Sequence, residues 1–277
     1  KDQLKVLPSY FGTARWVWNT CLRWRSHWYK QFNESVTGID FSRELTWLKK
    51  LESYKWLIAV PATISSQVLR DQDKAFAHFF AKRAKYPKRK KLTSSQSIRF
   101  QLDQRIIGNY FITGKLFKLP GLGTLDVRWS RIPTGIPKMV TLTRDTVGRY
   151  FISFMCEEVI ESLPETDQSI GIDLGITDII VDSLGNKSGN PRHLNKKIRR
   201  LKHYQRLLTR CQKGSQRRKK ALYRVAKQHV RIAEARKDWT QKKTTQIIKQ
   251  ADVIALENLN VKGMMKNHHL ARAIGDV

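Results

Sequence analysis

The sequence is short of acidic residues. Its 277 residues include 23 Asp and Glu against 53 Lys and Arg, which gives a formal net charge of +30. A charge this large destabilises a compact chain by self-repulsion unless a polyanion neutralises it. Nucleic acid is the first candidate partner, and an anionic membrane surface is the second.

Long apolar runs and cysteine motifs are missing as well. No stretch approaches the ~20 apolar residues that a helix needs to span a bilayer, and no signal peptide is visible. Cys21, Cys156 and Cys211 lie far apart and form neither a CxxC pair nor an obvious disulfide framework. We therefore expect free thiols in a reducing cytosol and no membrane segment.

Two short apolar runs each carry a carboxylate. Residues 169–176 read as a buried strand with Asp173 in the middle, followed by a second strand over 177–182 and a turn at 184–186. About eighty residues further on, the run 252–259 reads as another strand and contains Glu257. If the two carboxylate-bearing strands are neighbours in one sheet, Asp173 and Glu257 come together.

Such a pair suits a divalent metal ion. A bare carboxylate in a buried strand is costly unless a cation compensates its charge. Two convergent carboxylates can hold two metal ions about 3.5–4 Å apart for hydrolysis of a phosphodiester, and oxygen ligands favour Mg²⁺ or Mn²⁺. A single Asp in an apolar run is more often a strand-end residue, so the prediction depends on the pair and on the basic segment between its members.

That segment, residues 187–250, holds 22 Lys and Arg against only Glu234 and Asp238. Its apolar residues recur at helical spacing and predict two long helices that meet near residues 214–215. The apolar positions are Ile198, Leu201, Leu208, Leu222, Val225, Ile232 and Ala233. The basic positions expected to contact a nucleic-acid backbone are Lys196, Lys197, Arg199, Arg200, Arg217, Arg218, Lys219 and Lys220. Such residues position a nucleic acid and do not read its sequence.

The first 91 residues predict a helical region. Helices are expected over 7–32, from Asp40 or Ser42 to about 53, and from Pro61 onward. Early in the third helix, Ser66 and Gln67 either form an ordinary solvated turn or read base edges. The basic run 82–91 follows, and we expect Lys88, Arg89 and Lys90 in it to contact phosphates, although such runs are usually only solvated.

From residue 97 onward, apolar residues alternate with polar ones, which is the pattern of β-strands. Short strands are expected near 98–102, 110–112, 116–119, 127–132, 139–143 and 150–156, which suggests a small barrel. Arg99 and Gln101 lie on the polar face of the first strand, and we expect them to approach a nucleic acid if that face is not simply solvated. Residues 157–166 read as a linker.

Three motifs together carry a family resemblance. "GIDLGITD", the basic segment that begins "NPRHL", and "IALENLNVKGM" resemble the TnpB (OrfB) family, and "FGTARWVWN" is similar to the family's opening recognition helix. The family consists of transposon-encoded RNA-guided DNA nucleases related to type V CRISPR effectors. The resemblance implies that Asp173 and Glu257 are the first two RuvC carboxylates.

The resemblance also implies an α+β, multidomain architecture. It consists of a helical recognition region (1–91), a wedge β-barrel (92–164) and a RuvC or ribonuclease H-like nuclease domain (165–277) with the basic insertion 187–250. The chain starts at Lys1 instead of Met and stops at Val277, before the family's zinc element and third RuvC aspartate. We therefore expect both ends to be incomplete, with a zinc ion in the missing C-terminal part.

The function implied is metal-dependent cleavage of target double-stranded DNA in the cytoplasm of a prokaryote, at the nucleoid. Mg²⁺ or Mn²⁺ is the expected cofactor. The expected guide RNA, derived from a transposon end or of CRISPR type, pairs with the target beside a short adjacent motif. Two alternatives stay open: a nuclease-inactive RNA-guided DNA-binding protein or repressor of the same family, and a basic nucleic-acid-binding protein that needs no guide.

Overall fold

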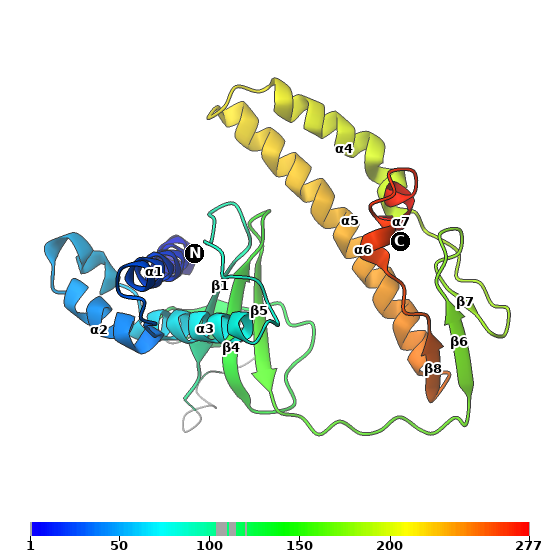
Figure 1. Ribbon diagram of the computed structural model, residues 1–277, viewed down its shortest axis with the longest axis horizontal. Helices are drawn as coiled ribbons and strands as arrows, with labels where there is room; N and C mark the ends of the chain where they lie inside the picture. The colour runs from blue at the N-terminus through cyan, green and yellow to red at the C-terminus, as the bar shows by residue number, and fades with distance from the viewer. Residues whose placement is uncertain (1, 104–109, 111–114, 120, 277) are drawn as a thin grey trace. The chain divides into compact units, whose positions relative to one another are not determined.

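The computed structural model describes residues 2–103, 110, 115–119 and 121–276 (Figure 1). The chain divides into two compact units, Lys1–Val159 and Ile160–Val277. Each mixes helices with strands, so the α+β class is confirmed. In the described ranges, no helix is both long and apolar enough to cross a membrane.

Helices open the first unit. They are α1 (Asp2–Phe32), α2 (Gly38–Leu48), the 3-10 helix η1 (Glu52–Leu57) and α3 (Ala62–Phe80). The cap of α2 is Thr37 and not Asp40 or Ser42 as expected, because the Thr37 hydroxyl accepts the Asp40 N–H while the Asp40 carboxylate accepts the Thr37 N–H at 2.8 Å. Those hydrogen bonds lower the pKa of Asp40. The third helix begins directly after Pro61, as predicted.

Two antiparallel sheets complete the first unit. Strands β1 (Gln96–Gln101), β4 (Pro137–Arg144) and β5 (Tyr150–Cys156) form one in the order β1-β4-β5, and β2 (Leu116–Leu119) pairs with β3 (Gly123–Asp126). Among the described strands there is no closed barrel. The strand predicted over 127–132 is wrong, because positive φ at Gly121 and Gly123 makes a tight turn that starts the strand earlier. The prediction for 110–112 falls largely outside the described residues.

The helices and the larger sheet share one apolar core. Val17 and Ile64 contribute from α1 and α3, and Phe100 and Val140 contribute from β1 and β4; each is at most 1% exposed. The alternation predicted for β1 is confirmed, because Ile98 and Phe100 are buried while the residues between and beside them are exposed. The core therefore fixes which face of β1 carries its polar residues.

The second unit contains a three-stranded sheet. Its strands are β6 (Ser169–Asp173), β7 (Val181–Asp182) and β8 (Val253–Leu256), in the order β7-β6-β8. Strand β7 is antiparallel to β6, whereas β8 is parallel to it. The prediction that the two carboxylate-bearing strands are neighbours is confirmed. The second strand is shorter than the predicted 177–182, because a hydrogen-bonded turn from Gly175 to Ile179 occupies its start.

Between β7 and β8 lies a long helical hairpin, α4 (His193–Arg210) and α5 (Gln216–Ile248), followed after β8 by the short helices α6 (Val261–Met264) and α7 (Ala271–Ile274). The predicted meeting point is confirmed: Gly214 has φ 86° and Ser215 caps α5. Leu201, Val225 and Ile232 form the buried contact. Leu222 and Ala233 belong to the same periodic pattern but are exposed, because each lies about 100° around the helix from a buried neighbour.

The first unit offers a direct test of its shared core. Phe100→Ala removes a ring that is 1% exposed and should lower the free energy of unfolding by about 3–5 kcal/mol. Phe151→Ala on β5, where the ring is 47% exposed, should cost less than about 1 kcal/mol. Seven of the eight tryptophans, all but Trp239, lie in this unit, so tryptophan fluorescence during urea unfolding reports on it. Equal losses in the two variants would contradict the assigned core.

Candidate nucleic-acid interface and carboxylate pair

The parallel pairing of β6 with β8 brings the ends of the two carboxylate-bearing segments next to each other. Its register pairs Ser169 with Val253 and ends with Ile172 opposite Leu256. Asp173 is the last residue of β6, and Glu257 follows directly after the last residue of β8. Both residues are exposed.

The backbone around Asp173 is held by local turns. A Cβ on Gly175 would lie 2.6 Å from the carbonyl oxygen of Asp178, so only glycine fits where the chain leaves β6. The Asp178 carboxylate accepts the Gly189 N–H at 3.2 Å, and the Asn190 amide donates to the Ile176 carbonyl at 2.8 Å. These bonds fix the loop that follows Asp173.

Asp252 anchors the opposite end of β8. Its carboxylate accepts the N–H groups of Thr166 and Asp167 at 2.8 and 2.7 Å, and these bonds lower its pKa. The segment that leads into β6 is thereby bound to the start of β8. Asp252 is therefore a positioning residue for the register that brings the two carboxylates together.

The aligned pair has the donor chemistry of a divalent metal site. Two carboxylates supply the oxygen ligands that Mg²⁺ and Mn²⁺ prefer. In the part of the chain that the structure describes, no group of three or more His, Cys, Asp or Glu side chains is placed to hold a metal. The residues present thus fit part of a metal site, with two ligands.

A further carboxylate, Asp276, caps the start of helix α4. It is 3% exposed and accepts the N–H groups of Leu194 and Asn195 at 2.6 and 3.0 Å, at the start of α4. The Arg236 guanidinium of α5 lies 3.3 Å from the same carboxylate. A carboxylate at a helix N-terminus compensates the unpaired N–H groups there. Asp276 therefore ties the end of the described chain to the helical hairpin.

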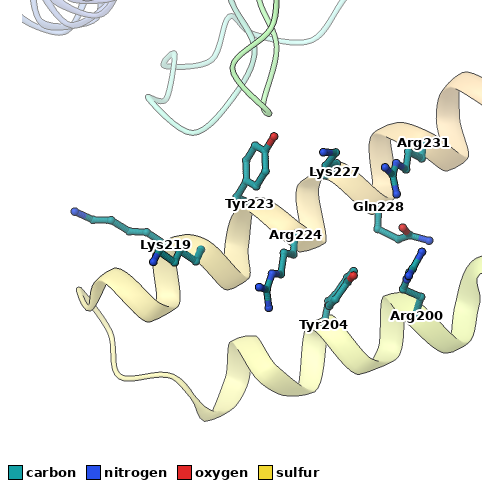
Figure 2. Close-up of a pocket in the computed structure, with 9 residues that line it drawn as sticks. Arg200, Tyr204, Lys219, Tyr223, Arg224, Lys227, Gln228 and Arg231 are labelled. Atoms are coloured by element: carbon teal, nitrogen blue, oxygen red, sulfur yellow. The ribbon is translucent and has the colours of Figure 1, made fainter.

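The hairpin carries a cationic groove of about 610 Å³ between its two helices. Figure 2 shows Arg200 and Tyr204 of α4 facing Arg224 and Gln228 of α5. Six of the nine lining residues are basic and none is acidic. The complete lining is Arg200, Tyr204, Lys219, Lys220, Tyr223, Arg224, Lys227, Gln228 and Arg231. Such a groove attracts phosphates, and its two tyrosines add surfaces for ring contacts.

The predicted basic residues of the hairpin divide into three groups. Arg200, Lys219 and Lys220 line the groove. Arg218 instead donates to the carbonyls of Leu208 and Cys211 at 2.9 and 3.1 Å and so closes the end of α4. Lys197 donates to the Arg231 carbonyl at 3.4 Å. Lys196, Arg199 and Arg217 are exposed on the hairpin surface.

Sequence reasoning missed several members of the groove. Tyr204, Tyr223, Arg224, Lys227 and Arg231 line it but were not predicted. Their spacing was a usable signal, because residues three and four apart share one helix face, and Lys220, Arg224, Lys227 and Arg231 follow that pattern. The tyrosines and Gln228, which is 3% exposed, carried no comparable signal.

The polar residues predicted on α3 and β1 meet through one carboxylate. Asp71 of α3 accepts from the amide of Gln67 and from the guanidinium of Arg99, both at 3.0 Å. Gln101 accepts from Arg70 at 3.3 Å. The polar residues predicted on α3 and those predicted on β1 therefore form one polar seam. Gln67 is only 8% exposed, and its amide already donates to Asp71. Ser66 is exposed and donates to the Ala62 carbonyl.

The predicted basic linker is fixed to α1. The Trp18 indole donates to the Lys88 carbonyl at 2.9 Å, and Asn19 exchanges two hydrogen bonds with the Lys90 backbone. The Lys90 ammonium lies 4.3 Å from the Trp18 ring centroid, and burial lowers its pKa. Lys88 and Arg89 remain exposed. The three cysteines are free, as predicted.

Comparisons with known proteins identify the class of this chain. A family profile described as "Probable transposase" matches residues 153–268, which include β6, the hairpin and β8. A profile described as "Helix-turn-helix domain" matches residues 1–34, most of which form the single helix α1. Both profiles belong to the OrfB family of transposon proteins.

Two curated relatives extend the match. A protein of Streptomyces pristinaespiralis named "Putative RNA-guided DNA endonuclease" is 38% identical over 278 aligned positions, covering 99% of this chain and 68% of that protein. "Putative RNA-guided DNA endonuclease InsQ" of Escherichia coli (strain K12) is 29% identical over 266 positions, covering 93% of this chain and 63% of that protein. The chain belongs to the OrfB (TnpB) family and spans about two thirds of the length of these relatives.

The groove makes a quantitative prediction about polyanion binding. Arg224→Gln with Lys227→Gln should weaken binding to an RNA–DNA duplex and reduce the slope of log K against log salt by about two. Lys242→Gln with Lys243→Gln removes the same charge from the same helix outside the groove and should change the slope much less. Fluorescence anisotropy titrations over a range of KCl concentrations measure both slopes. Equal slopes for the two double variants would contradict the groove as the contact surface.

Proposed function

We propose that this protein is an RNA-guided DNA endonuclease of the TnpB type. The observation that supports the proposal is the β6–β8 register, which pairs Ile172 with Leu256, the residues directly before Asp173 and Glu257, in a chain of this family. Two relatives bear the corresponding name. The proposal applies to the whole protein, of which this chain spans about two thirds by comparison with them.

In this proposal, Asp173 and Glu257 are the first two carboxylates of a RuvC-like, ribonuclease H-like site. They would hold Mg²⁺, with Mn²⁺ as a substitute, and a third carboxylate would come from outside the chain described here. The metal would supply an activated water and stabilise the leaving oxygen of the phosphodiester. The role of this chain's residues is to fix the two carboxylates at the end of β6 and β8.

The remaining surfaces would hold the nucleic acids. The cationic α4–α5 groove suits the sugar–phosphate backbone of a guide RNA–target DNA heteroduplex, which proteins recognise by shape and charge. The polar seam of Gln67, Asp71, Arg99 and Gln101 would face the duplex beside the target, where a short motif is read. Pairing between guide and target strand would provide the rest of the sequence specificity.

The test is plasmid depletion in cells that express the full-length protein with RNA from its own locus. A guide-matched target stands beside a randomised motif. We expect a subset of motifs to disappear, and Asp173→Ala or Glu257→Ala to restore them, with cleavage reduced by more than about 100-fold because even partners of metal ligands cost about 10–100-fold. Asp238→Asn, which alters an exposed carboxylate of α5 that pairs with Lys242 on the same helix, should keep most of the activity.

Two other outcomes would identify the alternatives. Guide-dependent pull-down of target DNA without depletion would mean an RNA-guided binding protein or repressor. Binding of any polyanion with no benefit from the matched RNA would mean a basic nucleic-acid-binding protein that needs no guide. Depletion that persists in both Ala variants would contradict the assigned carboxylates.

A further inference from the structure

Two cavities of different chemistry adjoin in the first unit. The larger, of about 870 Å³, is lined by five aromatic residues together with polar and aliphatic residues, from α1, α3 and the segments that follow each of them. The smaller, of about 360 Å³, is lined largely by polar and basic residues of α1 and the following linker. Ser26, Lys30 and Tyr86 line both, so the two cavities share one border.

The larger cavity presents open aromatic faces. Phe80 is 67% exposed, Tyr29 is 55% exposed and Tyr86 is 45% exposed. Tyr86 stands edge-on to Phe76 and Phe79, with ring centroids 5.5 and 5.4 Å away. These edge contacts hold the ring in place while much of it stays accessible. Fixed, exposed aromatic faces are the surfaces on which unpaired bases stack.

A half-buried ion pair forms part of the lining of this cavity. The Arg25 guanidinium is 8% exposed, pairs with Asp73, and lies 4.9 Å from the centroid of the Phe76 ring. Asp73 also accepts the Gly38 N–H at 2.9 Å. Asp73 is the one carboxylate of the larger cavity's lining, and Arg25 neutralises it. The cavity therefore does not repel an anionic ligand.

The smaller cavity, which shares a border with the larger one, is lined by cationic side chains. Arg23, Lys30 and Arg89 line it together with His27, and its lining contains no carboxylate. Arg89 lies between Lys88 and Lys90, whose backbone groups are hydrogen-bonded to Trp18 and Asn19 of α1. The cationic side chains therefore come from α1 and from the linker, two segments that are hydrogen-bonded to each other.

We propose that the two cavities together bind one unpaired RNA nucleotide, with its base on the aromatic side and a phosphate on the cationic side. Both volumes lie within the ~300–1,000 Å³ usual for small-molecule sites. Positive charge without free carboxylates favours a nucleic acid over a neutral or basic partner. The lining of the larger cavity also includes Ser26 and Ser35, whose hydroxyls can bond a ribose 2′-hydroxyl, and this favours RNA as the occupant.

This inference rests on the proposed function for the source of the RNA, which is an unpaired position of the guide. It adds a binding site in the helical region that acts by stacking, in contrast to the backbone contacts of the α4–α5 groove. Single-stranded RNA is held mostly by stacking and phosphate contacts, so removing the aromatic faces should weaken the complex without abolishing its salt dependence.

The first experiment measures equilibrium binding of the full-length protein to RNA from its own locus. Tyr29→Leu with Phe80→Leu keeps apolar side chains and removes two exposed rings; we expect the dissociation constant to rise at least about fivefold. Phe151→Leu removes a ring of similar exposure on β5 and should leave the constant unchanged. Lys30→Gln with Arg89→Gln should reduce the salt slope by about two and provides a second test should the aromatic variant fold poorly.

The second experiment identifies the occupant by photocrosslinking. RNA that carries 4-thiouridine at its unpaired positions should crosslink to peptides containing Tyr29, Phe80 or Tyr86. Crosslinks from 5-bromodeoxyuridine in the displaced DNA strand instead would assign the site to DNA and overturn the proposal. A self-association that the Tyr29→Leu, Phe80→Leu variant abolishes in sedimentation velocity, without any effect on RNA binding, would assign it to a second copy of the chain.

The two proposals fail in distinguishable ways. Should the wild-type protein bind its own RNA no better than an unrelated RNA, the guided function is wrong. Should the wild-type protein bind that RNA specifically while both double variants bind it as tightly, only the nucleotide site is wrong.

Discussion

The parallel hydrogen bonding of β6 with β8 is the constraint on which the proposed chemistry depends. Each strand is short, and about eighty residues separate Asp173 from Glu257 in the sequence. The pairing sets Ile172 opposite Leu256, so each carboxylate directly follows one member of a paired set of residues. Gly175, the Asp178 loop and Asp252 all act on this register, because they fix the chain where it enters and leaves the two strands.

Charge is the second constraint. The segment between the strands is strongly basic, yet its two helices share only a small buried contact around Leu201, Val225 and Ile232. Polar bonds supplement it, from Arg218 at the turn and from Asp276 at the start of α4. The basic side chains that line the groove repel one another, and a bound polyanion would relieve that repulsion. The same charge that weakens the isolated hairpin thus gives it affinity for nucleic acid.

Much of this arrangement was predictable from the sequence where a strong periodic signal existed. The hairpin, its turn at residues 214–215, helix α3 after Pro61 and the pairing of the two carboxylate strands were predicted and are present. The strand expected over 127–132 was wrong, because local apolar content does not specify where a turn falls. The hydrogen bond of Gln67 to Asp71 and the position of Tyr204 and Tyr223 in the groove depend on tertiary contacts, which a local sequence pattern does not encode.

The most direct test of the account is hydroxyl-radical cleavage by a bound metal. Fe²⁺ replaces Mg²⁺ in the full-length protein assembled with its RNA and target, and ascorbate with peroxide then generates radicals at the metal. The account predicts backbone cuts in two places, near residues 171–175 and 255–259, that disappear together in Asp173→Ala. Cuts near only one of these segments, or cuts that persist unchanged in Asp173→Ala, would contradict a shared metal site at the ends of β6 and β8.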